Sequence, residues 1–210
     1  MKKKHFFTGS VFQFYVPEIE KYAFCKFFDF RHLSEFHGLL AQVYDHFSDY
    51  EDNSLDDLKN CDWLFGARSM HRWPNLGKDT GWKSLCMLSA SGDEVIPDFK
   101  NAQVFHSIVE NEANIGSWFP VHNLTQRGEY CEYGQVKHLE HMVLTTSSLG
   151  LVWRTVMEYC RINNLPIKKY YDLDDLGVRS MYWQMINIPI YKTIPKEIRG
   201  KALTNTSQKT

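Results

Sequence analysis

The sequence predicts an α+β fold, in which an N-terminal β-rich region forms a twisted sheet or partial barrel and C-terminal helices pack on it. Two observations predict this fold. Short apolar and aromatic-rich runs alternate with turn residues through the first half of the chain, and apolar residues recur with a helical period after residue 148. With 210 residues, of which 43% are hydrophobic and 23% charged, the chain can bury a core without disulfides or metal ions.

Five strands are expected in the first half of the chain. The two opening runs flank a short linker that contains Pro17, and this arrangement is typical of a β-hairpin. The glycines and the proline between residues 72 and 81 place a loop before the last of the five strands. The expected strands are residues 11–16, 22–28, 39–44, 63–67 and 82–89.

The second half of the chain carries helical patterns. Residues 148–163 place apolar side chains at positions i, i+3, i+4 and i+7 and are followed by Pro166, so they predict an amphipathic helix. Residues 174–186 predict a second helix that begins at one of two aspartates. Residues 132–144 fit either a helix or a strand, and we favour the helix.

The change of period near residues 111–117 suggests a division of the chain. Residues 1–113 would then form the β-rich region and residues 114–195 the helical region. A single continuous α+β domain is the alternative, which we favour slightly because two helices and an uncertain third make a thin domain on their own. Residues 196–210 are polar and basic, and they predict a disordered tail.

Composition gives the expected location but no partner. The net charge of -1 favours neither acidic nor basic partners, and the five cysteines include no C-x-x-C pair, so a disulfide scaffold and a zinc site of four thiolates are unexpected. The basic N-terminus lacks the apolar core of a signal peptide, and no segment approaches the roughly 20 apolar residues of a membrane span. We therefore expect a cytoplasmic protein without a membrane partner.

An acidic segment, residues 45–57, holds six carboxylates in thirteen residues, with two aromatic residues among them. Ser54 is expected to cap a short helix within it. Such segments usually form solvated loops. The functional alternative is a docking surface for a basic protein partner, because charge speeds encounter and exposed rings supply buried area. The residues expected to contact the partner are Asp45, Phe47, Asp49, Tyr50, Glu51, Asp52, Asp56 and Asp57.

The pair His138 and His141 is the candidate for metal binding. Two histidines three residues apart share a face of a helix, and Glu129, Glu132 or His122 could supply a third ligand. The metalloprotease spacing H-E-x-x-H is absent, and two imidazoles on an amphipathic helix are the more ordinary interpretation. We expect no metal and no cofactor.

Catalytic and nucleic-acid signatures are also missing. The sequence holds no phosphate-binding glycine loop and no nucleophile elbow, and none of the cysteines has a visible activating base, so no catalytic residue is assigned. The lysine–tyrosine cluster at residues 168–171 is the nearest match to a nucleic-acid contact. It is short, and the sequence pI is near 6.7, so nucleic-acid binding is not expected.

The opening of the chain resembles a known family. Gly9 precedes the first strand, which includes Val11-Phe12, the second strand contains Tyr22-Ala23-Phe24, and a third run ends at Tyr44-Asp45. In these features the N-terminal half is similar to the bacterial immunity protein 26 family. The resemblance implies a β-rich cytoplasmic protein that binds and neutralises a cognate toxin, and it implies no catalytic residues.

The favoured hypothesis is therefore a non-enzymatic binding protein of the immunity type. One alternative is a metal-dependent enzyme that uses His138 and His141. Another is a structural or assembly subunit of a phage or defence complex, which would pack through its aromatic residues.

Overall fold

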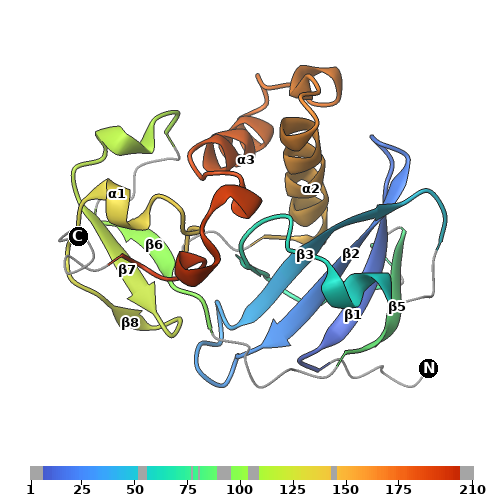
Figure 1. The fold of residues 1–210 in the computed structure, drawn as a ribbon, viewed down its shortest axis with the longest axis horizontal. Helices are drawn as coiled ribbons and strands as arrows, with labels where there is room; N and C mark the ends of the chain where they lie inside the picture. Colours follow the sequence, from blue (N-terminus) through green and yellow to red (C-terminus); the bar gives the residue numbers. More distant parts are fainter. Residues whose placement is uncertain are drawn as a thin grey trace.

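The computed structural model describes residues 7–51, 56–76, 78–79, 81–88, 96–103, 109–142 and 146–203. These residues contain a five-stranded antiparallel sheet, a separate three-stranded sheet and C-terminal helices (Figure 1). The predicted α+β fold, with helices of the C-terminal half packed on the N-terminal sheet, is confirmed.

The larger sheet has the strand order β4-β3-β2-β1-β5. The predicted hairpin is confirmed, because β1 and β2 pair in antiparallel register with Val16 opposite Lys21. The third and fifth expected strands are also present, although β3 extends further than the sequence indicates. The strands are β1 (Ser10–Val16), β2 (Lys21–Asp29), β3 (Leu39–Ser48), β4 (Arg68–Ser69) and β5 (Trp82–Met87).

The strand predicted at residues 63–67 is wrong. Trp63 forms a single bridge with Tyr44, and the ladder with β3 resumes only at β4. The neighbouring side chains Leu64 and Phe65 are both buried, whereas successive side chains of a strand point to opposite faces. The run is apolar because a bend in the chain buries adjacent residues. A strand buried on both faces has the same apolar sequence, so the sequence alone cannot distinguish the two structures.

Two helices cover one face of the larger sheet, and both predictions are confirmed. Helix α2 (Ser148–Ile162) begins where the Ser147 side chain accepts a hydrogen bond from the Gly150 amide. Helix α3 (Leu176–Ile186) begins at Asp175, whose carboxylate accepts a hydrogen bond from the amide of the third helical residue. Buried residues of both helices pack against alternate residues of β1, β2 and β3, including Phe12, Phe14, Cys25, Phe27, Ala41 and Val43.

The opposite face of the sheet is covered as well. Leu58, from a single turn of 3-10 helix (η1, Asp57–Asn60), packs against Val11, Phe24 and Tyr44. Burial on both faces explains why β1 and β2 have nearly continuous apolar sequences in place of an alternating pattern.

The helix favoured at residues 132–144 is mostly wrong. Within the described part of this range, residues 132–142, only α1 (Tyr133–Val136) is helical, and it starts with a capping box between Glu132 and Gln135. Beyond it the chain extends beside β6 (Phe99–Ala102): the Lys100 amide donates to the Glu140 carbonyl, and the Met142 amide donates to the Lys100 carbonyl. Pairing with this distant strand overrides the local helical preference.

The second sheet was not predicted. Strand β6 contains two polar residues in four, and β7 (Trp118–His122) contains Pro120, so neither sequence resembles a strand. The division expected between residues 113 and 114 falls between β6 and β7, which pair with each other. This pairing joins the two regions that the sequence divides. The sheet is completed by β8 (Gln126–Arg127).

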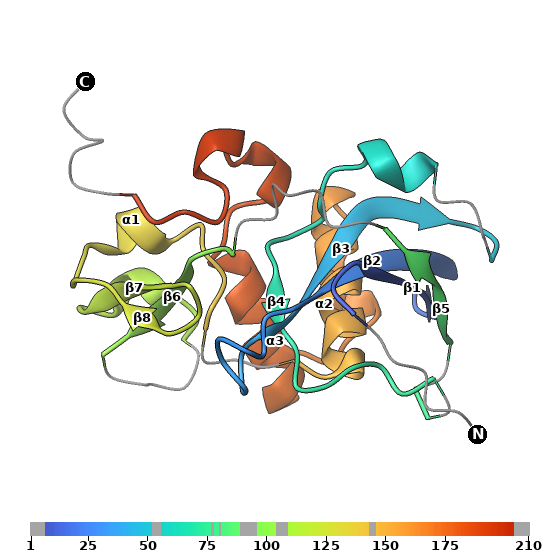
Figure 2. The ribbon, with the colours of Figure 1, turned by 90° about the horizontal axis from the view of Figure 1, so that it is seen from below.

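The expected tail is ordered as far as residue 203, so that prediction is wrong for residues 196–203. Arg199 donates two hydrogen bonds of 2.8 Å to Asp62, and the Leu203 amide donates to the Gln135 carbonyl. Figure 2 shows this segment, in red, running towards α1. Residues 204–210 lie outside the described residues.

The remaining 3-10 helices are η2 (Glu112–Asn114), η3 (Ile167–Lys169), η4 (Tyr191–Thr193) and η5 (Lys196–Ile198).

A glycine with no room for a methyl group tests the loop that joins β2 and β3. A Cβ on Gly38 would collide with the backbone carbonyl oxygens of Phe30 and Ser34. We expect Gly38→Ala to lower the free energy of unfolding by about 1–3 kcal/mol, the usual cost of overpacking. Urea denaturation followed by circular dichroism measures it.

The matched control is Gly134→Ala in α1, where nothing lies within 4 Å of the added Cβ. That change should stabilise the protein by about 0.5–1 kcal/mol, because alanine restricts the unfolded chain more than glycine does. Equal effects of the two substitutions would contradict the described geometry of the loop.

Candidate functional site

The acidic segment crosses the outer end of the larger sheet. Asp49 forms an ion pair with Lys21 at the start of β2, and Glu51 forms one of 2.7 Å with Lys83 in β5. The two lysines belong to β2 and β5, the strands on either side of β1 in the sheet. The hydrogen bond with Asp49 raises the pKa of Lys21.

The exposed centre of this segment is Tyr50. This residue is 70% exposed, and the flanking side chains of Asp49 and Glu51 are 78% and 51% exposed. A large ring between two accessible carboxylates can contact a partner through both apolar area and charge. We call residues 49–51 the acidic–aromatic surface.

Two other expected contact residues lie apart from Tyr50. Phe47 is partly buried in the core beneath α2, where its ring meets that of Tyr159 edge to face at 4.9 Å. The Asp45 side chain is 29% exposed, and its backbone amide donates to the Asp62 carbonyl. The structure therefore does not present Phe47 beside Tyr50, although the two are only three residues apart.

The remaining expected contacts belong to η1 or lie outside the described residues. Asp56 precedes η1 and pairs with Lys59 at 2.6 Å, and Asp57 is exposed in its first turn. Asp56 is the residue before the helix but makes no capping hydrogen bond with its side chain. Asp52 lies outside the described residues, and so does Ser54, which the sequence predicts as the helix cap.

The two candidate metal-binding histidines face different partners. His138 Nε2 lies 2.7 Å from the Lys201 carbonyl oxygen, and His141 Nε2 lies 2.6 Å from Glu112 Oε1. They do not share a helical face, because α1 ends at Val136. Of the suggested third ligands, His122 pairs with Asp98 and Glu132 caps α1. Within the described ranges no group of three or more His, Cys, Asp or Glu side chains is placed to hold a metal ion.

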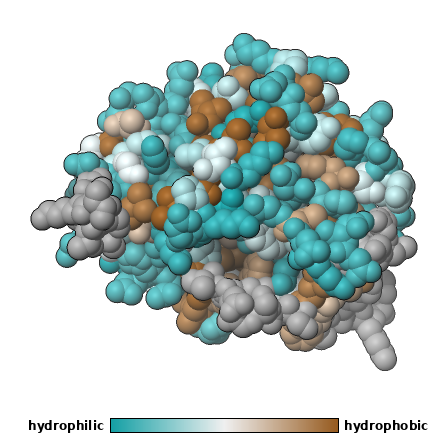
Figure 3. All heavy atoms as spheres, viewed as in Figure 1, coloured by the Kyte–Doolittle hydropathy of each residue, from teal (hydrophilic) through white to brown (hydrophobic). Residues whose placement is uncertain are grey.

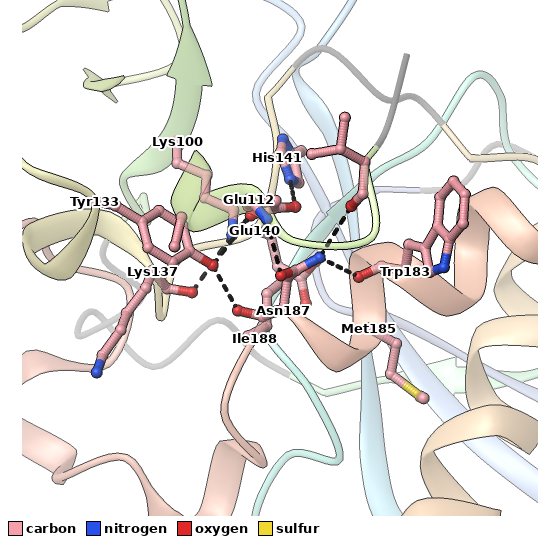
Figure 4. A network of polar contacts seen from close by, with 12 residues as sticks. Lys100, Glu112, Tyr133, Lys137, Glu140, His141, Trp183, Met185, Asn187 and Ile188 are labelled. Carbon is pink, nitrogen blue, oxygen red and sulfur yellow. Dashed lines mark hydrogen bonds and ion pairs between the residues drawn. The ribbon is translucent and has the colours of Figure 1, made fainter. Parts of the chain in front are cut away.

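Glu112 is the centre of a buried polar network (Figure 4). Its carboxylate accepts a hydrogen bond of 2.6 Å from Lys100 Nζ and lies against His141 on its other oxygen. The Tyr133 hydroxyl donates to the backbone carbonyl of Asn187, and the Asn187 side chain accepts from the Glu112 amide. The network joins β6, η2, α1 and the end of α3.

Burial and pairing compete in setting the charges of this network. Burial raises the pKa of Glu112, but His141 and Lys100 outweigh it, so the pKa lies below its ordinary value. Burial also lowers the pKa of Lys100 and raises that of Tyr133 well above the ordinary range. The side chains of Lys100 and Glu112 are 0% and 2% exposed, so a substrate does not reach them and the network ties elements together.

A second buried network centres on Glu140. Its carboxylate lies 2.7 Å from Arg68 Nη1 and 3.2 Å from Arg154 Nη2. Arg154 also pairs with Glu158 at 2.9 Å, and Glu158 pairs with Arg161. Burial raises the pKa of Glu140, but Arg154 and Arg68 hold it below its ordinary value. Burial also raises the pKa of Glu158, and the nearby charges of Arg154 and Arg161 offset this rise only in part.

The sequence interpretation missed both networks. A signal for the second one was present, since Arg154, Glu158 and Arg161 follow the i, i+4 and i+3 spacing of ion pairs on a helix. No comparable signal exists for Lys100 and Glu112, because their pairing depends on how β6 folds beside η2.

Comparison with known proteins adds no relative. No protein-family model matches this chain, and no curated protein or solved structure does. None of the helices among the described residues has the length and apolar character needed to cross a membrane.

Removal of the Glu140 charge should destabilise the protein, because the two arginines paired with it stay buried. Glu140→Gln leaves Arg68 and Arg154 buried with reduced compensation, and we expect a loss of about 3–5 kcal/mol in the free energy of unfolding. Urea denaturation at pH 7 measures the loss. Asp49→Asn, which breaks the exposed pair with Lys21, is the control and should leave the midpoint nearly unchanged. Similar losses in both variants would contradict this account.

The buried His138 ring predicts a pH dependence of stability. Burial holds its pKa below the ordinary value of 6.5, so the unfolded chain takes up this proton at a higher pH than the folded protein does. The contribution of neutral His138 is therefore present above pH 6.5 and declines as the pH falls below that value.

The variant His138→Gln should reduce the loss of stability between pH 7.5 and pH 5.5, as measured by urea denaturation at each pH. His71→Gln, at an exposed position, is the control and should keep the loss of the unmodified protein. Equal slopes for His138→Gln and the unmodified protein would refute the prediction.

Proposed function

We propose that this protein is a non-enzymatic binding protein of the immunity type, which binds and neutralises a cognate bacterial toxin through the acidic–aromatic surface. The observation that carries the proposal is the exposed Tyr50 ring between two accessible carboxylates. The resemblance of the N-terminal half to the immunity protein 26 family supports it, since the acidic–aromatic surface directly follows β3, one of the matching strands.

The surface is held in place before a partner arrives. Lys21 and Lys83, on two different strands, pair with the residues on either side of Tyr50. Anchoring at two points lowers the conformational entropy that an exposed ring would lose on binding. The carboxylates remain accessible, so a cationic side chain of the partner can join each pair from the solvent side.

The charge of the region fits a basic partner. Of the residues expected to contact the partner, five acids are described, and four of them pair with a lysine: Asp45 with Lys192, Asp49 with Lys21, Glu51 with Lys83 and Asp56 with Lys59. The carboxylates of Asp49 and Glu51 stay exposed beside their lysines. Exposed carboxylates attract a positively charged cleft, such as the active site of an enzyme that acts on phosphates, and increase the association rate.

The interior supports a binding role over a catalytic one. The networks around Glu112 and Glu140 are formed by side chains that are buried and paired, so their perturbed pKa values serve packing. The five free cysteines support a reducing compartment, and we propose a cytoplasmic location.

The first test is affinity capture of the tagged protein from its native host, followed by mass spectrometry. We expect to capture one protein partner in stoichiometric amount. This partner should have an enzymatic activity that the tagged protein inhibits. Capture without any such partner, at a salt concentration that preserves ionic contacts, would contradict the proposal.

Charge reversal then tests the surface itself. The double variant Asp49→Lys and Glu51→Lys should lower the association rate with the captured partner about tenfold at low salt, and the difference should shrink as salt is added. Stopped-flow fluorescence measures the rate. The matched control reverses two exposed acids elsewhere, Glu110→Lys and Glu129→Lys. An unchanged rate in the first variant, or an equal fall in the control, would refute this surface as the contact site.

A further inference from the structure

A cavity of about 850 Å³ lies against the outer face of the larger sheet. Its floor includes Phe28, Leu40 and Tyr44, which alternate along β2 and β3 with side chains that pack under the helices. Residues 191–201 form part of its wall. Figure 3 shows a hollow in the molecular surface, with hydrophobic residues visible inside it. The volume of the cavity falls within the range of sites that bind small organic molecules.

The apolar lining is dominated by aromatic rings. Trp63 stacks on Tyr44 with ring centroids 4.4 Å apart and meets Phe28 edge to face at 6.5 Å. The rings of Phe28 and Phe30 are parallel within 3°, with centroids 6.5 Å apart. Because aromatic rings prefer offset-stacked and edge-to-face contacts, this lining favours a flat ligand over a flexible chain. The aromatic residues of the lining are Phe28, Phe30, Tyr44, Trp63, Phe99 and Tyr191.

The acidic groups of the lining are already neutralised within the protein. Asp98 lies 2.7 Å from His122 Nδ1, and Glu140 is held by the two arginines described above. His138 hydrogen-bonds through Nε2 to the Lys201 carbonyl oxygen, and burial lowers the pKa of its ring, which is therefore neutral at pH 7. These groups leave no carboxylate of the described lining available for a cationic ligand.

The cations of the lining are either engaged or hydrated. Arg199 Nη1 donates two hydrogen bonds of 2.8 Å to Asp62, and the buried Lys26 is held by contacts within the protein. Lys59 and Lys201 are exposed, so water screens their charges. A ligand that carried a charge into the cavity would lose its hydration without gaining a free countercharge, and this loss is costly.

We propose that this cavity binds a flat, uncharged, ring-containing organic molecule, which stacks against Trp63 and Phe28. This inference goes beyond the proposed function and does not depend on it, because the cavity and the acidic–aromatic surface share no residue.

Two fluorescent probes with the same rings test the charge of the ligand on the full chain. N-phenylnaphthylamine is uncharged, whereas anilinonaphthalenesulfonate carries one anionic group on the same rings. We expect the neutral probe to bind one site per chain, at least about tenfold more tightly than the sulfonate, because the sulfonate must give up its hydration. Equal affinities, tighter binding of the sulfonate, or no saturable binding of the neutral probe would overturn the proposal.

Competition between two alcohols tests the preference for rings. Naphthol and decanol have the same number of carbon atoms and one hydroxyl group each, but only naphthol is flat and aromatic. Naphthol should displace the bound N-phenylnaphthylamine at a lower concentration than decanol does. Decanol is the more hydrophobic of the two, so apolar burial alone would give the reverse order. Displacement by decanol at the same or a lower concentration would overturn the preference for a flat ligand.

Substitution of Trp63 tests where the probe binds. Trp63→Ala should weaken the binding of N-phenylnaphthylamine about tenfold, the value of a lost aromatic stack, and Trp63→Phe should retain most of it. Trp183→Ala, at a partly exposed tryptophan outside the cavity, is the matched control and should leave the affinity unchanged.

A circular dichroism spectrum of each variant confirms that it is folded. Should Trp63→Ala not fold, the probe pair and the two alcohols on the unmodified protein decide. Full affinity in a folded Trp63→Ala variant, or an equal loss in Trp183→Ala, would overturn the assignment of Trp63.

Discussion

The Glu140 carboxylate is the contact on which the arrangement of this protein depends. It pairs with Arg68 at the edge of the larger sheet and with Arg154 in α2. Its backbone carbonyl accepts the amide of Lys100 in the second sheet, and Arg68 donates to Gln184 in α3. Glu140 therefore connects both sheets and α2 directly, and it reaches α3 through Arg68. Burial of so many charges is costly, and the arrangement is stable only while each charge keeps its partner.

The two buried networks meet at Lys100. Its backbone extends the second sheet to residues 140–142, while its ammonium pairs with Glu112 and lies over the rings of Trp118 and Tyr133. A shift of β6 by one residue would move this ammonium to the other face of the sheet and leave Glu112 without it. The polar interior thus fixes one register for a sheet whose short strands have little apolar content of their own.

The sequence predicted those elements whose signals are local. The β1–β2 hairpin has apolar runs around a turn, and α2 has a regular helical stripe, so both follow from neighbouring residues. Strands β6 and β7 could not be predicted in this way, because Lys100 and Pro120 are acceptable there only through partners far along the chain. The run 63–67 failed for a related reason, since a bend and a buried strand give the same apolar pattern.

The same distinction applies to the candidate sites. The exposure of Tyr50 agrees with its polar surroundings in the sequence, whereas Phe47, three residues earlier, belongs to the core. The cavity of about 850 Å³ beside β2 and β3 could not be predicted, because its lining comes from segments between Lys26 and Lys201 that only the fold brings together. The acidic–aromatic surface is the place where we propose that a protein partner binds.

Native-state hydrogen exchange tests most directly whether the networks unite the chain. The amides of Lys100 and Met142, which join the second sheet to residues 140–142, should exchange with the same opening free energy as the central amides of β2, because breaking the networks unfolds both sheets together. Exchange of Lys100 and Met142 through a separate opening of lower free energy, with β2 still protected, would show that the second sheet unfolds independently and would contradict the central role of Glu140.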